Sequence, residues 1–128
     1  MNIIASIARI LLGLMFFVFG LNGFLHFLPM GPLPTGIAGQ FVGALFQSHY
    51  IFVVAGIQVI GGALLLFNRY VPFALVILGP IIVNICLFHL LMSSTGWYMA
   101  LLVGVLWVIV AIRARHYLAG IFAQRMEA

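Results

Sequence analysis

The chain has 128 residues, of which 66% are hydrophobic and only 5% are charged. Soluble domains carry about 25% charged residues, so this composition excludes a soluble domain and predicts a chain that lies in a bilayer. Because a helical crossing takes about 20 apolar residues, the chain has room for four crossings with short connections and for no separate soluble domain.

The net charge of +4 comes from five Arg residues and one acidic residue, and the Arg residues are scattered along the chain. Nucleic-acid binding needs basic residues that cluster on a face exposed to water, so we exclude nucleic acid as a partner. We interpret the Arg residues as topology signals instead.

Four apolar runs predict transmembrane helices over about residues 3–28, 50–67, 71–92 and 97–113. Prolines between Pro29 and Pro34 end the first run, because proline cannot continue a helix. Residues 37–47 have apolar side chains at helical spacing and are expected to lie at the membrane interface. Residues 114–126 either do the same or prolong the fourth helix. The sequence predicts one all-α domain over residues 1–128, an integral membrane four-helix bundle with short interfacial helices.

The Arg residues lie near the start of the first run (Arg9), between the second and third runs (Arg69) and after the fourth run (Arg113, Arg115 and Arg125). The other two connections carry none. Because positive charge is retained on the cytoplasmic side, we expect both termini to be cytoplasmic and those two connections to face outward.

Small residues recur inside the runs, and helices in lipid approach closely where such residues meet. They are Gly13 and Gly20 in the first run, Ala55, Gly56, Gly62 and Ala63 in the second, and Gly96, Ala100 and Gly104 in the fourth. We expect tight packing along all three stripes, with Gly104 pressed against another helix. Pro80 is expected to kink the third helix.

Five polar residues lie inside the runs, and the cost of polar groups in hydrocarbon predicts that they face a partner or a cavity. They are Asn22, His26, Gln58, Asn84 and His89. Asn22 and His26 share a helix face, and Gln58 lies in the small-residue stripe of the second run. We expect these three to line one polar cavity, with His89 at its rim and Asn84 deeper.

Several interpretations of these side chains stay open. In the first, the amides form hydrogen bonds between helices and the histidines reach interfacial water. In the second, these side chains contact a quinone, whose carbonyl oxygens accept hydrogen bonds from neutral donors. Metal or haem ligation ranks last, since only His49 would complete a cluster of three histidines. Asn84 and His89 lie about 140° apart around a helix, so they share a site only through a kink at Pro80 or a wide cavity.

Groups for self-contained catalysis are missing from the sequence. No carboxylate lies in any run, and neither paired acids nor a phosphate-binding loop nor a nucleophile with its base occurs. The missing carboxylates also disfavour a proton-coupled transporter.

Four segments combine glycine with apolar and polar residues in a recognisable order. They are residues 9–13 (RILLG), 20–23 (GLNG) with His26 and Phe27, 61–66 (GGALLL), and 79–84 (GPIIVN) with Phe88 and His89. Together they resemble the DoxX family of small membrane proteins. The resemblance covers all four runs and implies a four-helix bundle in the bacterial cytoplasmic membrane. Gln58 stands where many relatives have Glu, and an amide does not titrate.

The family is named for a subunit of a thiosulfate:quinone oxidoreductase, so the resemblance implies a respiratory or redox context. We therefore expect a small membrane subunit or accessory protein without its own catalysis, in contact with lipid and with other subunits or further copies of itself. A quinone-binding subunit of an oxidoreductase, such as one of the thiosulfate:quinone type, is the alternative. A small transporter ranks below both.

Overall fold

Helices make up the regular structure of the part of the chain that the computed structural model describes, which is residues 2–26, 34–94 and 96–126. They are α1 (Asn2–Leu25), α2 (Gly36–Gln47), α3 (Tyr50–Leu66), α4 (Val71–Leu91), α5 (Trp97–Arg113), α6 (Arg115–Leu118) and a 3-10 helix η1 (Ala119–Phe122). The predicted all-α class is confirmed. Pro29 and Pro32, expected to end the first helix, lie outside the described residues.

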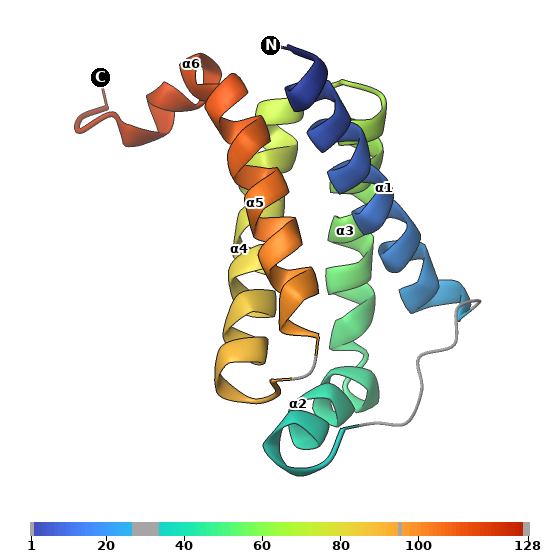
Figure 1. Cartoon of the computed structure of the whole chain (residues 1–128). Helices are drawn as coiled ribbons and strands as arrows, with labels where there is room; N and C mark the ends of the chain where they lie inside the picture. Colours follow the sequence, from blue (N-terminus) through green and yellow to red (C-terminus); the bar gives the residue numbers. More distant parts are fainter. Residues whose placement is uncertain (1, 27–33, 95, 127–128) are drawn as a thin grey trace.

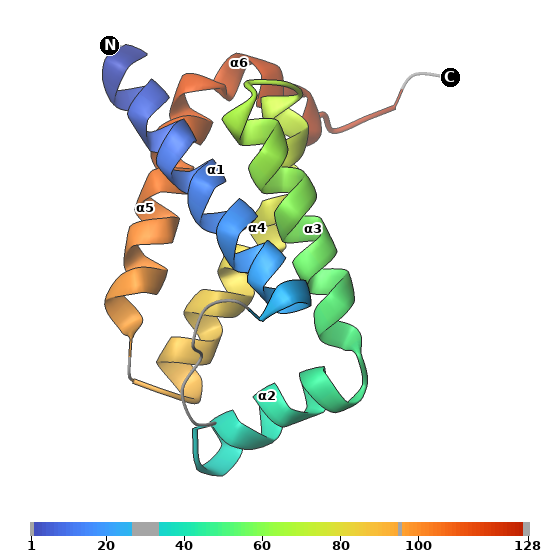
Figure 2. The ribbon, with the colours of Figure 1, turned by 90° about the vertical axis from the view of Figure 1, so that its right-hand side faces the viewer.

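The four helices α1, α3, α4 and α5 pack side by side as a four-helix core (Figures 1 and 2). α1 contacts α3 and α5, and α4 contacts the same two helices from the other side. Short connections make α3, α4 and α5 successively antiparallel, and α3 also runs antiparallel to α1, because α1 ends and α3 begins at the end where α2 lies. Both termini therefore lie at one end of the core, which we call the terminal end, and α2 lies across the opposite end (Figure 1).

The chain bends sharply at two places. α2 and α3 meet at 84°, and α5 and the segment Arg115–Phe122 meet at 85°. The segment Arg115–Phe122 therefore does not continue α5 along the same axis. α1 ends at Leu25, earlier than expected, and His26 follows with a φ of 54°.

Two helical segments, Ile3–Leu25 and Val71–Leu91, are long and apolar enough to cross a membrane, and the number is four if each bent pair is counted as one span. Large apolar side chains are exposed around the core, for example Ile7, Val83 and Leu101. Helices of soluble proteins have polar residues on their outward faces. This surface therefore suits contact with lipid.

The closest helix contact joins α1 and α3, and glycine makes it possible. A Cβ added at Gly62 would lie 2.5 Å from the amide nitrogen of Phe17 and 2.7 Å from the carbonyl oxygen of Gly13. A Cβ added at Gly20 would lie 2.9 Å from the carbonyl oxygen of Ala55. The predicted small-residue stripes of the first two runs thus face each other, backbone against backbone.

The stripe predicted in α5 is wrong at Gly104. A Cβ added there would meet nothing within 4 Å among the described residues, whereas Ala100, Val103 and Val110 are buried. Successive residues of a helix are about 100° apart, so turning Val103 inward places Gly104 at the edge of the contact. Ala100 is buried as expected, but the rest of the buried face of α5 is formed by Val103, Leu106 and Val110 and not by glycine.

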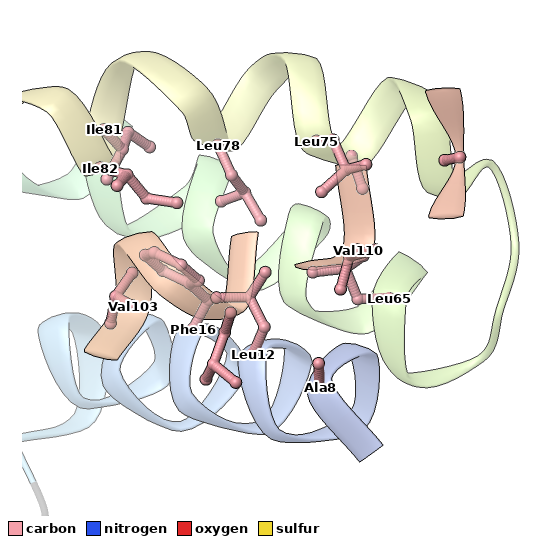
Figure 3. Packing of buried hydrophobic residues seen from close by; sticks show 13 residues of the cluster. Ala8, Leu12, Phe16, Leu65, Leu75, Leu78, Ile81, Ile82, Val103 and Val110 are labelled. Carbon is pink, nitrogen blue, oxygen red and sulfur yellow. The ribbon is translucent and has the colours of Figure 1, made fainter. Parts of the chain in front are cut away.

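Apolar side chains from all four core helices fill the interior (Figure 3). Leu12, Leu65, Leu75 and Leu78 have no solvent-accessible surface. Leu78 of α4 packs directly on Gly61 of α3, since a Cβ added at Gly61 would lie 2.7 Å from the Leu78 Cγ. Gly61 therefore faces α4, and its neighbour Gly62 faces α1.

Trp107 links α5 to α4 by a hydrogen bond from its indole Nε1 to the carbonyl oxygen of Leu75, at 3.0 Å. The indole passes over Gly79, where an added Cβ would lie 3.8 Å from Cζ2 of Trp107. α4 continues without a break through Pro80. The Trp107 side chain of α5 thus contacts α4 at Leu75 and Gly79, just before Pro80.

Gly62→Ala is expected to destabilise the protein by about 1–3 kcal/mol, because the added methyl group meets the backbone of α1 and overpacks the contact. Gly104→Ala is the matched control, since its methyl group meets open space. Thermal unfolding in detergent, followed by circular dichroism, measures both. Equal stability of the two variants would contradict the close α1–α3 contact.

Trp107→Phe is expected to cost about 0.6–2 kcal/mol, the range for one polar contact between helices in a membrane protein. An aromatic ring remains but the indole N–H and part of the ring system are removed, so the loss reports the hydrogen bond to Leu75 together with some packing on α4. Trp97→Phe serves as the control because Trp97 is 57% exposed. If both variants unfold at the wild-type temperature, the indole bond contributes nothing to the packing of α5 on α4.

Candidate functional site

A groove of about 570 Å³ lies between α2, α3 and α4, near the end of the core that α2 covers. Ligand pockets commonly measure about 300–1,000 Å³. Most of its walls are apolar and aromatic, with a few polar groups among them. The lining residues are Phe41, Val42, Ala44, Leu45, Ser48, Tyr50, Ile51, Val54, Gln58, Ile81, Asn84, Ile85, Phe88 and His89.

Three of the five predicted site residues, Gln58, Asn84 and His89, line this groove. Gln58 comes from α3, where Ile51, Val54 and Gln58 form one stripe. Asn84 and His89 come from α4 and reach the same space despite their separation around the helix. A wide cavity, which is one of the two conditions stated above for these residues, brings them together.

His89 supplies the polar group in this groove whose hydrogen bonding is incomplete. Its Nδ1 is buried and has no hydrogen-bond partner among the described residues. Phe88 covers one side, with the two rings edge to face and their centroids 5.2 Å apart. Leaving a buried polar atom unpaired costs about 1–3 kcal/mol, so a ligand that bonds to Nδ1 gains free energy.

α2 forms the wall of the groove that faces away from the core. Its Phe41 ring lies 5.8 Å from the Phe88 ring of α4, centroid to centroid. Ser48 holds the bend between α2 and α3, because its Oγ accepts a hydrogen bond from the amide of Tyr50 at 3.2 Å. The sequence analysis assigned α2 to the interface and missed its aromatic contact with α4.

Asn22 and His26 do not line the groove, which corrects the expectation that they share a cavity with Gln58. Asn22 is 6% exposed and has an interaction partner within the protein. His26 is exposed, and its ring centroid lies 6.4 Å from that of Phe46.

Asn22 and His26 lie apart from Gln58 because α3 contacts α1 and α4 through different faces. Ala55 and Gly62 face α1, and Gln58 lies about 60° away from Ala55 around the helix, toward α4. A sequence pattern does not resolve two stripes that are so close, and the prediction merged them.

The histidines do not assemble into a metal site within the described residues, where no group of three His, Cys, Asp or Glu side chains is placed to hold an ion. The His49 ring stacks on the Phe52 ring at a centroid distance of 5.7 Å. His89 is the one histidine that lines the groove. The polar groups that line the groove are the amides of Gln58 and Asn84, the imidazole of His89 and the hydroxyl groups of Ser48 and Tyr50.

Comparisons with protein-family models, with curated proteins and with solved structures find no match for this chain.

Proposed function

We propose that the protein is an integral membrane accessory subunit of a redox complex, and that its groove binds a quinone. The unpaired Nδ1 of His89, together with Gln58 and Asn84 in the same apolar groove, carries this proposal. A quinone has carbonyl oxygens that accept hydrogen bonds and an apolar tail that suits aromatic walls. The resemblance to DoxX proteins implies the same redox context.

The membrane part of the proposal rests on the apolar outer surface and on the candidate spans. In this proposal α1, α3, α4 and α5 cross the membrane as a four-helix bundle, and α2, which meets α3 at 84°, lies at the interface beside the groove. A lipid-soluble ligand then enters from the bilayer. Residues 114–126 lie along the opposite surface, and other subunits or further copies of the chain cover part of the exposed apolar faces.

A binding role suits the groove better than catalysis. Its polar side chains are two amides, an imidazole and the hydroxyl groups of Ser48 and Tyr50, and no carboxylate side chain occurs in the described residues. An amide neither takes up nor releases a proton near neutral pH, so Gln58 orients a ligand and does not titrate. Electron transfer to or from the bound quinone then needs a partner subunit that carries a redox centre.

Gln58→Leu/His89→Phe is expected to weaken quinone binding about tenfold, since two neutral hydrogen bonds contribute about 0.5–1.5 kcal/mol each. A short-chain ubiquinone or menaquinone analogue is titrated into the detergent-purified protein, and quenching of tryptophan fluorescence gives the dissociation constant. The apolar lining remains, so binding is weakened and not abolished.

The double variant Gln47→Leu/His26→Phe makes the same chemical changes outside the groove lining and is the control for this experiment. It should bind the quinone like the wild type. No binding of either quinone by the wild type, or an equal loss in both double variants, would contradict the proposal.

The orientation follows from the Arg residues. Arg9 and Arg113 line one cleft at the terminal end of the core, Arg69 follows α3 at that end, and α2 at the other end has no charged residue. We propose that the terminal end faces the cytoplasm of a bacterial cell, because positive charge is retained there.

Cysteines placed at Ser94 and Gln124, each in a Cys86→Ala background, test this orientation. In intact cells an impermeant maleimide should label the cysteine at Ser94, and it should label the one at Gln124 only after the membrane is opened. The reverse labelling pattern would place the terminal end outside.

A further inference from the structure

A second hollow, the terminal cleft, lies at the end of the core opposite the groove. It measures about 350 Å³ and is lined by Ala5, Ser6, Arg9, Asn68, Val71, Val110, Arg113, Ala114 and Tyr117. Two guanidinium groups thus share a space with the hydroxyl groups of Ser6 and Tyr117 and the amide of Asn68. The sequence analysis used the Arg residues for topology alone, and only the fold brings Arg9 and Arg113 together.

Arg9 is held at this cleft by α3. Its Nη1 donates hydrogen bonds to the carbonyl oxygens of Leu65 and Leu66, the latter at 3.4 Å, in the last turn of α3. The Leu65 carbonyl also accepts a hydrogen bond from the amide of Asn68 at 3.3 Å. Nε and Nη2 have no hydrogen-bond partner among the described residues. A helix C-terminus carries only about half a negative charge, so it orients Arg9 without neutralising it.

Arg113 is the freer of the two cations. It is exposed and has no hydrogen-bond or ion-pair partner within the described ranges, whereas Nη1 of Arg115 donates to the carbonyl oxygen of Ile112 at 2.9 Å. The only acidic residue of the chain is Glu127, which lies outside those ranges. The described cleft therefore holds two positive charges and no counterion.

The start of α4 adds to this positive environment. α4 begins at Val71, which lines the cleft, and no side chain caps its first turn or places an acidic group there. The N-terminal end of a helix attracts anions through its unpaired amides and its dipole. The start of α4 and the guanidinium groups of Arg9 and Arg113 thus both favour a negatively charged ligand.

We propose that the terminal cleft binds a phosphate group, of an anionic phospholipid or of a soluble phosphate. Arg pairs with phosphate through two parallel hydrogen bonds, and the planar guanidinium groups of Arg9 and Arg113 supply such donors from two sides. Hydroxyl and amide groups complete the polar wall, and Val71, Val110 and Ala114 give it an apolar floor. This site is separate from the quinone groove and does not depend on it.

The experiment uses the detergent-purified chain in two arms. In the first, native mass spectrometry measures how much phosphatidylglycerol and phosphatidylcholine the protein retains from micelles that contain equal amounts of each. In the second, titration calorimetry measures binding of inorganic phosphate without added lipid. We expect wild-type protein to retain phosphatidylglycerol at least fivefold over phosphatidylcholine, or to bind phosphate.

Arg113→Gln is expected to reduce that binding about tenfold or more, because hydrogen bonds to charged groups are the strong ones. Arg125→Gln removes the same charge from outside the cleft and should bind like the wild type. Arg9→Gln is made as well, and circular dichroism shows whether it still folds, since Arg9 also holds the end of α3.

Each outcome decides the proposal. Selective retention of phosphatidylglycerol identifies a lipid head group, and binding of inorganic phosphate identifies a soluble ligand, provided that Arg113→Gln removes either. Equal retention of both lipids without phosphate binding would overturn the site. So would binding that survives Arg113→Gln, or that Arg125→Gln weakens to the same extent. Failure of quinone binding leaves this result unaffected.

Discussion

The contact between α1 and α3, in which backbone meets backbone, sets the positions of most other parts. Gly13 and Gly20 are seven residues apart, as are Ala55 and Gly62, so two antiparallel helices meet at matching points two turns apart. In lipid no hydrophobic force drives helices together, and packing at such points does so instead. The same register brings Arg9, four residues before Gly13, onto the last carbonyls of α3.

The groove follows from how α3 meets its two partners. One face of α3 is occupied by α1, so Gln58 on the neighbouring face is left for α4. At Gly61 the two helices close tightly, because Leu78 fits directly onto the glycine. Toward α2 the lining residues of α3 and α4 surround open space, and α2 covers it through the contact of Phe41 with Phe88. α3 and α4 thus pack tightly around Gly61 and leave the groove between them toward α2.

The sequence predicts the helices well because long apolar runs allow few alternatives. It also predicts close packing at the small residues of the first two runs, but not that these two stripes face each other. It fails where the outcome depends on rotation about a helix axis. A turn of about 60° separates Gln58 from the stripe that faces α1, and one residue separates Gly104 from the buried Val103. The terminal cleft could not be predicted from the sequence, because Arg9 and Arg113 come together only after α1 and α5 have packed.

The two hollows differ in charge, and this difference decides what each can accept. A charged head group in the groove has no counterion, since no Arg, Lys, Asp or Glu side chain lines it, and charge is costly in apolar surroundings. The groove therefore suits an uncharged head group. In the terminal cleft the two guanidinium groups repel each other until an anion lies between them, so it selects negative charge. The five Arg residues lie in segments toward the terminal end, so the ligands proposed for the two hollows, one neutral and one anionic, would bind at opposite ends of the protein.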